Sequence, residues 1–260
     1  MFRLEDVILT ILQGLAEWWP ISSSAVVSFA SLKLGYSIEK SLEYALSLHL
    51  GSGLAVLLVF RKDLIMFFEG FSDKSTIYFN KKSYIYSLIL SFLVALPLYL
   101  FIKELWELYG YITLLIVAFG LLVTTFLLEK GRGLKKIVSD KDMLVTGLLQ
   151  GISVLPGFSR KGLTTGYLII KEYEPEIAVK VSFLLGAPAL ISAGLYNSYI
   201  LVKSGELSLS TMVILQTIVF VLSVVSAKSF LKFSQKVNAR FFTLFLAIFI
   251  VLSVILELMS

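Results

Sequence analysis

Six stretches of roughly 20 apolar residues limit what this chain can fold into. A helix needs about 20 residues to cross the core of a bilayer, where only helices and closed barrels satisfy their backbone hydrogen bonds. The composition agrees, since 57% of the residues are hydrophobic and 16% are charged, against about 25% charged in soluble domains. We predict an all-α integral membrane protein with six transmembrane helices, at 41–60, 83–102, 109–128, 181–202, 211–231 and 241–258.

Two further apolar regions, 4–34 and 143–170, are interrupted by polar turns that contain proline. The first turn reads EWWPISSS and the second LPGFSRKG. Each half has only about 12 to 15 residues, which is too few to span a bilayer. We therefore expect two re-entrant helical hairpins, whose irregular backbone is tolerated at membrane depth only if it is buried in protein or lines a cavity.

The two interrupted regions resemble each other, which indicates a duplicated unit. Gln13-Gly14 matches Gln150-Gly151, and LHLGSGLA at 48–55 matches LLGAPAL at 184–190. Three predicted spans separate the hairpins, so the second copy is reversed and the chain forms an inverted-topology repeat. The predicted single transmembrane domain, 1–260, comprises repeat 1 at about 1–102, repeat 2 at about 140–231, and extra helices at 109–128 and 241–258.

The loop charges predict the orientation. Sixteen Lys or Arg residues lie in 61–82, 129–142, 171–180 and 228–240, whereas five lie on the other side. Because cytoplasmic loops carry the excess of Lys and Arg, the first side is expected in the cytoplasm. We thus predict a multi-pass protein of the cell membrane with its N-terminus and first hairpin facing the extracytoplasmic side. The net charge of +5 reflects these loops and predicts no nucleic-acid partner.

Glu17 and the serines after it are the first candidate site. No Lys or Arg lies within ten residues of Glu17, and a carboxylate at membrane depth is a functional candidate by default. The alternative is an interfacial hairpin tip with Trp18 and Trp19 in an aromatic belt. Serines after a proline also cap helices. Capping explains one or two of Ser22, Ser23 and Ser24, whereas a nucleophile beside Glu17 is the competing interpretation.

Arg160 in the second turn is the second candidate. Ser159 is expected to cap the following helix, which places Arg160 at its N-terminus. A cation opposes the helix dipole there unless an anion is bound too, so a phosphate site is favoured. The alternative is an Arg160–Lys161 pair reaching to the cytoplasmic interface. Thr164 adds a hydroxyl one turn later, although it can simply bond back to a helix carbonyl.

His49 is the only histidine, which excludes a multi-histidine metal centre, and the absence of cysteine excludes disulfides and thiolate metal sites. A lone histidine in a span is more often packed than a ligand, but the repeat places His49 beside the first hairpin. One carboxylate, several hydroxyls and one arginine inside the membrane suit a phosphorylated ligand with a lipid tail.

At these residues the chain resembles the undecaprenyl-diphosphate phosphatase (bacitracin-resistance) family, which recycles the polyprenyl carrier lipid by removing one phosphate. QGLAEWWPISSS at 13–24, LHLGSGLAVLLVF at 48–60, LPGFSRKGLTT at 155–165 and VSFLLGAPAL at 181–190 carry the resemblance. It implies Ser23 as nucleophile, Glu17 as base or metal ligand, and Arg160 holding the diphosphate. It assigns Ser22, Ser159 and Thr164 to substrate binding, where we also expect Gln13, Ser24 and His49.

The resemblance further implies a divalent cation, magnesium or calcium, held by Glu17 and Gln13, and a possible homodimer among membrane lipids. Three positions depart from the family pattern. Gln13 replaces a carboxylate, Val26 replaces a histidine and Lys161 replaces a serine. His49 is a candidate to approach the vacant histidine position. These departures put the catalytic assignment in question more than phosphate binding.

Two functions follow from these residues. The first is hydrolysis of a polyprenyl diphosphate of undecaprenyl type to the monophosphate and phosphate, at a site facing the extracytoplasmic side. The second is a transporter or flippase of polyprenyl phosphate without hydrolytic activity, because inverted repeats with broken helices are common in transporters. A purely structural membrane protein would leave Glu17 and Arg160 unexplained.

Overall fold

The computed structural model describes residues 3–18, 23–69, 78–108, 134–155 and 158–233, and the single residues 119, 122 and 248. This part of the chain is helical and contains no strand, only an isolated bridge between Lys135 and Tyr173. The all-helical class is therefore confirmed for the described residues. The predicted spans 109–128 and 241–258 fall outside them, apart from those three single positions.

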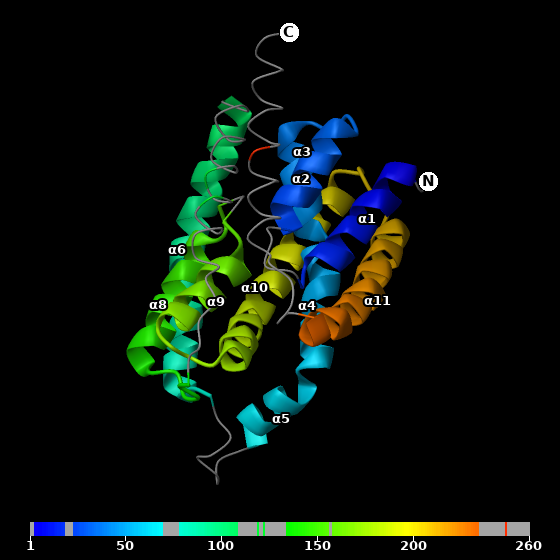
Figure 1. Ribbon diagram of the computed structural model, residues 1–260. Coiled ribbons are helices and arrows are strands. Elements are labelled where there is room, and N and C mark those ends of the chain that lie inside the picture. The colour runs from blue at the N-terminus through cyan, green and yellow to red at the C-terminus, as the bar shows by residue number, and fades with distance from the viewer. Residues whose placement is uncertain are drawn as a thin grey trace.

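Among the described residues, four helical segments are long and apolar enough to cross a membrane, and each coincides with a predicted span (Figure 1). The first, Lys40–Val59, contains α3 (Ile38–Ser47) and α4 (His49–Val59). The others lie in α6 (Lys81–Leu108), α10 (Pro175–Lys203) and α11 (Leu209–Phe233). A short helix, α5 (Arg61–Glu69), follows α4.

Each interrupted region forms two short helices. α1 (Leu4–Ala16) and α2 (Ser23–Lys33) have 13 and 11 residues, and α8 (Asp140–Ile152) and α9 (Arg160–Ile170) have the same lengths. At about 1.5 Å per residue, the longer ones reach only about 20 Å, less than a bilayer core of about 30 Å. The two helices of each pair contact each other.

Each short pair also packs on a long helix from the other half of the chain. α1 lies along α11, and α8 lies along α6. A Cβ atom on Gly14 would come within 2.7 Å of the Leu222 Cβ of α11, and one on Gly151 would come equally close to the Val94 Cβ of α6. The two Gln-Gly motifs therefore mark equivalent close contacts between helices, which small residues permit.

The span predicted at 41–60 is divided at Leu48, between α3 and α4. In an unbroken helix the Gly51 N–H would donate to the Ser47 carbonyl. Here the Gly51 N–H donates to Gln216 Oε1 at 2.8 Å, and the Ser47 carbonyl accepts from Gln216 Nε2 at 3.0 Å. The Gln216 amide of α11 thus replaces one helix hydrogen bond, and such an insertion breaks a helix. The break leaves His49 at the start of α4.

Trp18 lies inside the protein. Its side chain is fully buried and stacks on Phe183 of α10, with ring centroids 4.5 Å apart. Phe60, at the end of α4, lies 6.0 Å away. The alternative of an interfacial aromatic belt is therefore wrong for Trp18, while Trp19 lies outside the described residues. The stacked rings anchor the turn that carries Glu17 against α10.

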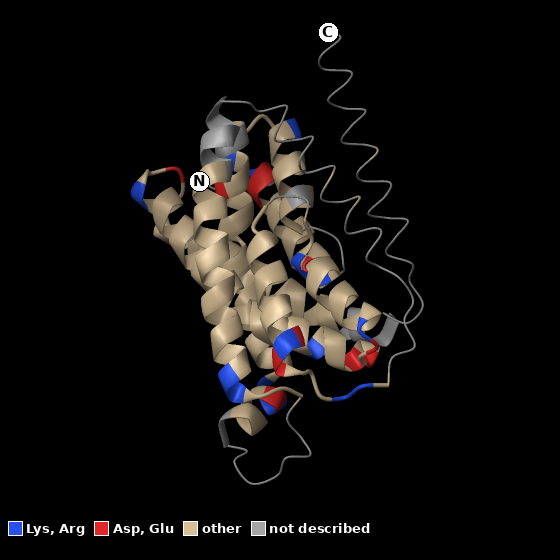
Figure 2. Ribbon diagram, turned by 90° about the vertical axis from the view of Figure 1, so that its left-hand side faces the viewer, with Lys and Arg blue, Asp and Glu red and all other residues tan. Residues whose placement is uncertain are grey.

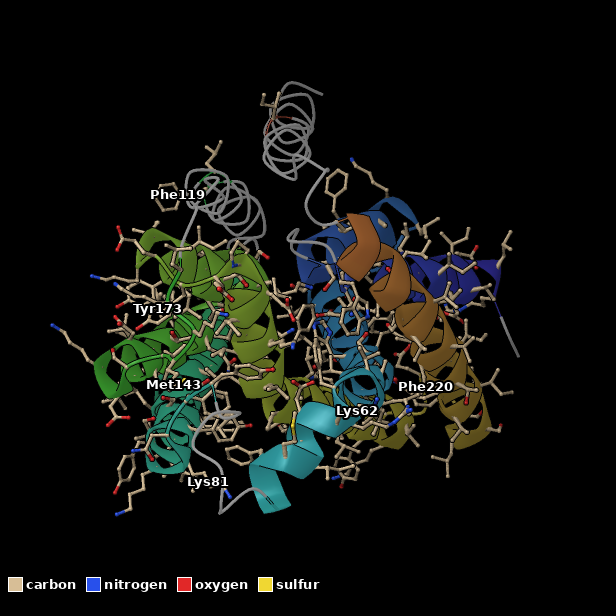
Figure 3. All side chains as sticks on the ribbon, turned by 60° about the horizontal axis from the view of Figure 1, so that its bottom comes forward. Lys62, Lys81, Phe119, Met143, Tyr173 and Phe220 are labelled. Atoms are coloured by element: carbon tan, nitrogen blue, oxygen red, sulfur yellow. The ribbon has the colours of Figure 1, made fainter. Side chains whose placement is uncertain are left out.

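The charged residues gather at the two ends of the helices (Figure 2). The end where α5 lies in Figure 1 is the richer in Lys and Arg, as the sequence pattern predicts for one side of the membrane. A small group of opposite charges lies midway between the ends. Figure 3 looks onto the end with Lys62 and Lys81, and there Met143 of α8 and Phe220 of α11 lie on opposite sides of the molecule.

Candidate active site

Glu17 directly follows α1, and its side chain is 2% exposed. One carboxylate oxygen, Oε1, accepts from Arg160 Nη2 at 3.1 Å and from Lys161 Nζ at 3.0 Å. The other, Oε2, accepts from Ser23 Oγ at 2.7 Å and from Gln13 Nε2 at 2.8 Å. Both interrupted regions therefore meet on one buried carboxylate, although about half the chain separates them.

Ser23 begins α2 and is buried. Its hydroxyl donates to the Glu17 carboxylate, which leaves the oxygen lone pairs of Ser23 free to face the cavity. Ser24 lines the same cavity, whereas Ser22 lies outside the described residues. A serine whose proton is held by a carboxylate has the local arrangement of an activated nucleophile.

Arg160 is the first residue of α9, where the Ser159 hydroxyl caps the helix by accepting from the Gly162 N–H at 3.2 Å. This confirms the predicted cap. The guanidinium lies against Gly186 of α10, where any Cβ atom would overlap it. Its Nη1 is buried and has no hydrogen-bond partner among the described residues. A cationic group at a helix N-terminus with a spare donor suits an anion.

Lys161 also points inward. The side chains of Arg160 and Lys161 are 11% and 6% exposed, so the alternative of a pair reaching to the membrane interface is wrong. Lys161 is a site residue that the sequence prediction missed, although it belongs to the same turn motif. Two cations facing one carboxylate leave the cluster with an excess positive charge. That excess favours a phosphate ligand.

Gln13 and Thr164 stand behind the site and do not line the cavity. Gln13 donates to Glu17 and, at 3.3 Å, to Ser52 Oγ, while its Oε1 has no partner among the described residues. The Thr164 hydroxyl bonds to the Arg160 carbonyl at 2.7 Å and to Ser182 Oγ at 2.6 Å. This placement matches the alternative in which Thr164 bonds back to its own helix.

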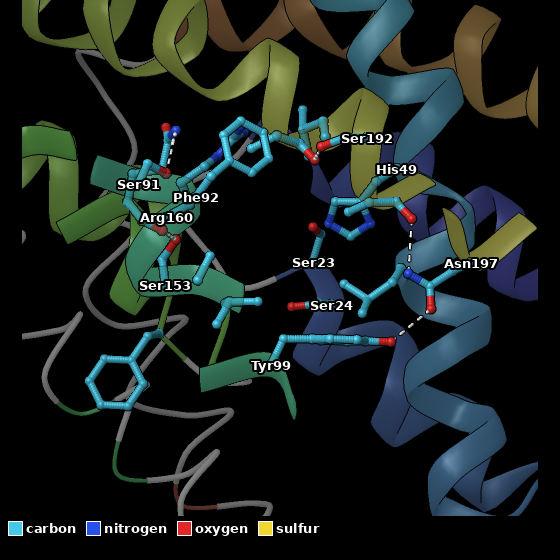
Figure 4. Close-up of a pocket in the computed structure, with 18 of the residues that line it drawn as sticks. Ser23, Ser24, His49, Ser91, Phe92, Tyr99, Ser153, Arg160, Ser192 and Asn197 are labelled. Atoms are coloured by element: carbon cyan, nitrogen blue, oxygen red, sulfur yellow. Dashed lines mark hydrogen bonds between the residues drawn. The ribbon is translucent and has the colours of Figure 1, made fainter. Parts of the chain in front are cut away.

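His49 lies beside the carboxylate, with Nε2 3.8 Å from Glu17 Oε2. Its Nδ1 is 2.9 Å from the Ala45 carbonyl, which can only accept a hydrogen bond. Nδ1 therefore carries a proton, and in the neutral ring Nε2 is the basic nitrogen that faces Glu17. Since Ser23 bonds to the same carboxylate oxygen, His49 and Ser23 are neighbours (Figure 4).

These groups line a cavity of about 260 Å³ (Figure 4). Its far wall holds polar groups that sequence reasoning missed. Only Gln150 carried a signal in the sequence, through its match to Gln13. Ser91, Tyr99 and Asn197 lie in long apolar helices and Ser153 directly follows α8, and no motif marks these four residues. The remaining wall is apolar and comes mainly from α6 and α10, which supply Phe92, Ala95, Leu96, Ala189, Leu190 and Ala193. Leu46 of α3, and Val154 and Phe158 between α8 and α9, complete it.

The donor set does not fit a divalent cation. Such ions take several oxygen ligands, usually more than one of them a carboxylate. In the described part of the chain no three His, Asp or Glu side chains gather. Glu17 supplies a single carboxylate, whose Oε1 already faces two cations and whose Oε2 accepts from the amide nitrogen of Gln13.

Comparison with known proteins identifies the relatives of this chain. The family described as bacitracin resistance protein BacA matches residues 6–255. A relative from Methanococcoides burtonii, named undecaprenyl-diphosphatase, is 31% identical over 97% of this chain and 98% of its own length. Proteins of the same name from Saccharolobus islandicus and Christiangramia forsetii are 34% and 32% identical. They cover 74% and 79% of this chain, and 72% and 80% of their own lengths.

Proposed function

The chain belongs to the bacitracin resistance protein BacA family, and on that premise we propose that it hydrolyses a polyprenyl diphosphate of undecaprenyl type to the monophosphate and phosphate. It is a multi-pass membrane protein, and its relatives are named for this activity. One structural observation supports the proposal independently of the names of the relatives. The Ser23 hydroxyl donates to a buried carboxylate that also faces Arg160 and Lys161, inside a cavity between long apolar helices.

The cavity has a charged, polar wall and an apolar wall, which we assign to the diphosphate and to the isoprene chain of the substrate. The diphosphate enters between Arg160, whose Nη1 is unpartnered in the described part, and Lys161. Ser24 and Ser159 line the same end of the cavity and supply further polar contacts, as we expect for Ser22. The first isoprene units lie against the apolar wall of α6 and α10, where Phe92 and Leu96 are 43% and 62% exposed and lead outward to the lipid.

The reaction has two steps. Ser23 Oγ attacks the terminal phosphorus, its proton passes to Glu17 Oε2, and the bond to the bridging oxygen breaks, releasing polyprenyl monophosphate. Water then attacks the phosphoserine and gives a proton to His49 Nε2, while Glu17 returns a proton to Ser23 Oγ as phosphate leaves; His49 releases its proton to solvent. Arg160 and Lys161 stabilise the charge on the equatorial oxygens throughout. No step passes through a metal ion.

The two short helix pairs are proposed as re-entrant hairpins of an inverted repeat. Repeat 1 includes α1 to α6, and repeat 2 includes α8 to α11. Their short helices of matching length support this proposal, as does the exchanged packing of α1 on α11 and of α8 on α6. In folds of this type the site lies where interrupted helices meet near the membrane midplane.

The cavity is proposed to open to the extracytoplasmic side of the cell membrane. The excess of Lys and Arg at the end with α5 supports this orientation, since that end is then cytoplasmic. A homodimer stays a prediction from the family resemblance. Light scattering on the protein purified in detergent would measure the mass of the assembly.

The test is phosphate release from undecaprenyl diphosphate by the purified protein. We expect release from the diphosphate and none from the monophosphate. Arg160→Ala and Glu17→Ala are expected to abolish it, and full activity in either variant would contradict the assigned roles. Movement of lipid phosphate across proteoliposomes without release of phosphate would instead identify a carrier.

A further inference from the structure

Lys161 is an unusual component of a membrane cavity. It is the second residue of α9, so its ammonium lies near a helix N-terminus, where the dipole is unfavourable for a cation. The side chain is buried, with Nζ 3.0 Å from Glu17 Oε1 and 5.9 Å from the Phe183 ring centroid. A buried cation in such a place is costly. Its presence at this cost indicates a role in the site.

The charge around Glu17 is arranged for an anion without a metal. Phosphoryl transfer needs positive charge on the equatorial oxygens of the phosphate, and divalent cations commonly supply it. Here Lys161 and Arg160 already place two positive charges on the same carboxylate oxygen. A divalent cation bound to Glu17 would have to displace both side chains or lie against them.

Gln13 completes this arrangement. Its Nε2 donates to Glu17 Oε2 at 2.8 Å, a bond that a carboxylate at the same position would replace with repulsion. With a neutral residue at 13, the cluster of Glu17, Arg160 and Lys161 carries an excess of one positive charge. A second carboxylate in place of Gln13 would remove that excess and create a pair of carboxylates able to hold a cation.

We propose that the Lys161 ammonium replaces a divalent metal in this protein, so that phosphate is released from the diphosphate without any metal ion. This inference rests on the proposed phosphatase function and departs from the divalent cation that the family resemblance implies. Gln13 and Lys161 act together. Because Gln13 is neutral, a metal ion finds only one carboxylate, that of Glu17, and Lys161 supplies the positive charge that the ion would otherwise bring.

Two measurements on the full-length protein in detergent test the proposal. Phosphate release from undecaprenyl diphosphate is measured with excess EDTA and with added magnesium, and Mn²⁺ binding is measured by electron paramagnetic resonance. For the wild type we expect equal rates in both conditions and no bound Mn²⁺. Activity that EDTA abolishes and magnesium restores, or Mn²⁺ bound by the wild type but not by Glu17→Gln, would overturn the proposal.

Variants sharpen the test. Lys161→Ser should lose about 10²-fold or more in kcat with EDTA present, as when a donor to the developing charge is removed. Gln13→Glu/Lys161→Ser should bind Mn²⁺ and become dependent on magnesium. Lys33→Ser, which removes an exposed lysine from α2, should keep the metal-independent rate. A Lys161→Ser variant as active as the wild type in EDTA contradicts the role of Lys161.

The outcomes separate this inference from the proposed function. No phosphate release under any condition overturns the phosphatase function, and the Mn²⁺ measurement still tests the metal site by itself. Release that requires a metal keeps the function and overturns the inference. If the double variant does not fold, the two wild-type measurements decide the question.

Discussion

Glu17 interacts both with the two cations of the site and with the proposed nucleophile. It offsets one of the two positive charges of Arg160 and Lys161 when no substrate is bound, and it accepts the hydrogen bond of the Ser23 hydroxyl. Leaving one member of a buried ion pair without its partner typically costs about 3–5 kcal/mol, far more than losing a pair at the surface. A bound phosphate can replace the carboxylate as the counter-ion, because it brings its own negative charge to the two cations. The cations therefore face the Glu17 carboxylate in the free protein and the phosphate in the complex.

Glu17→Gln should therefore lower the free energy of unfolding by about 3 kcal/mol. Pyrophosphate should raise the melting temperature of this variant more than that of the wild type, since the anion replaces the lost carboxylate. Thermal melting in detergent measures both effects. Glu176→Gln, which alters a carboxylate that is 74% exposed, is the control and should change little. An equal response of variant and wild type to pyrophosphate would contradict the anion site.

Ser23→Ala should reduce kcat for phosphate release by about 10³-fold or more, because it removes the attacking oxygen. The KM for the diphosphate should change little, since the two cations remain. Ser31→Ala is the matched control. Its hydroxyl is buried in the same helix, bonds to the Ser28 carbonyl and does not line the cavity. Equal rates for the two variants would rule out Ser23 as the nucleophile.

At the scale of elements, two close approaches hold the site together. α9 reaches α10 at Gly186, where the absence of a side chain leaves room for the Arg160 guanidinium. The Gln216 side chain of α11 enters the break between α3 and α4 and satisfies the backbone groups left open there. The first contact orients a charge, while the second maintains a helix break beside His49. Mutations should therefore separate activity from stability.

Gly186→Ala should lower kcat/KM by about 10²-fold, because a Cβ atom there displaces the guanidinium from its working position. The melting temperature should change little, since a flexible side-chain end can move aside. Gly147→Ala gives the contrasting case, because its Cβ atom would meet the backbone of Ser87 in α6 at 2.5 Å. That variant should melt at a lower temperature. A Gly186→Ala protein that melts as early as Gly147→Ala would show a packing role only.

Gln216→Leu should lower the free energy of unfolding by about 1–3 kcal/mol, because it leaves the Gly51 N–H buried without a partner. The Ser47 carbonyl keeps only the longer bond from Ser198 Oγ, at 3.4 Å. Thermal melting in detergent again measures the change. Thr217→Val, at the exposed neighbouring position, should stay within about 0.5 kcal/mol of the wild type. Equal stability of both variants would mean that other groups satisfy the break.

At the scale of the whole molecule, the two halves of the chain exchange partners. α1 packs on α11, from the second half, and α8 packs on α6, from the first half. Neither short pair can therefore be removed without exposing a long helix of the other half. The turns that follow α1 and precede α9 meet only when both halves are assembled, so the site belongs to the complete arrangement and to no single repeat.

The proposed topology predicts opposite access for two exposed positions. Lys82 is the second residue of α6, near the end with α5, and Ser204 follows α10. The chain has no cysteine, so Lys82→Cys and Ser204→Cys each supply a single thiol. In intact cells a membrane-impermeant maleimide should label Ser204→Cys, and it should reach Lys82→Cys only after the cells are permeabilised. Labelling of both thiols in intact cells would contradict the spanning arrangement.

The hydropathy and residue spacing of the sequence by themselves determined where the spans lie and where the two interruptions fall. Spans depend on the apolar character of about 20 consecutive residues, which is a local property, so 83–102, 181–202 and 211–231 coincide with α6, α10 and α11. The interruptions are local too. Each polar turn falls between two short helices, and the Ser159 cap depends on residues only three positions apart.

Only the tertiary structure decided which distant groups meet. Glu17 and Lys161 are 144 positions apart, and nothing in the local pattern indicated that Lys161 points inward instead of reaching for the membrane surface. The break at Leu48 depends on Gln216 from another helix, and the burial of Trp18 depends on Phe183. Contacts of this kind arise when helices pack against one another, so the chain's hydropathy locates the interruptions, and packing determines what they bring together.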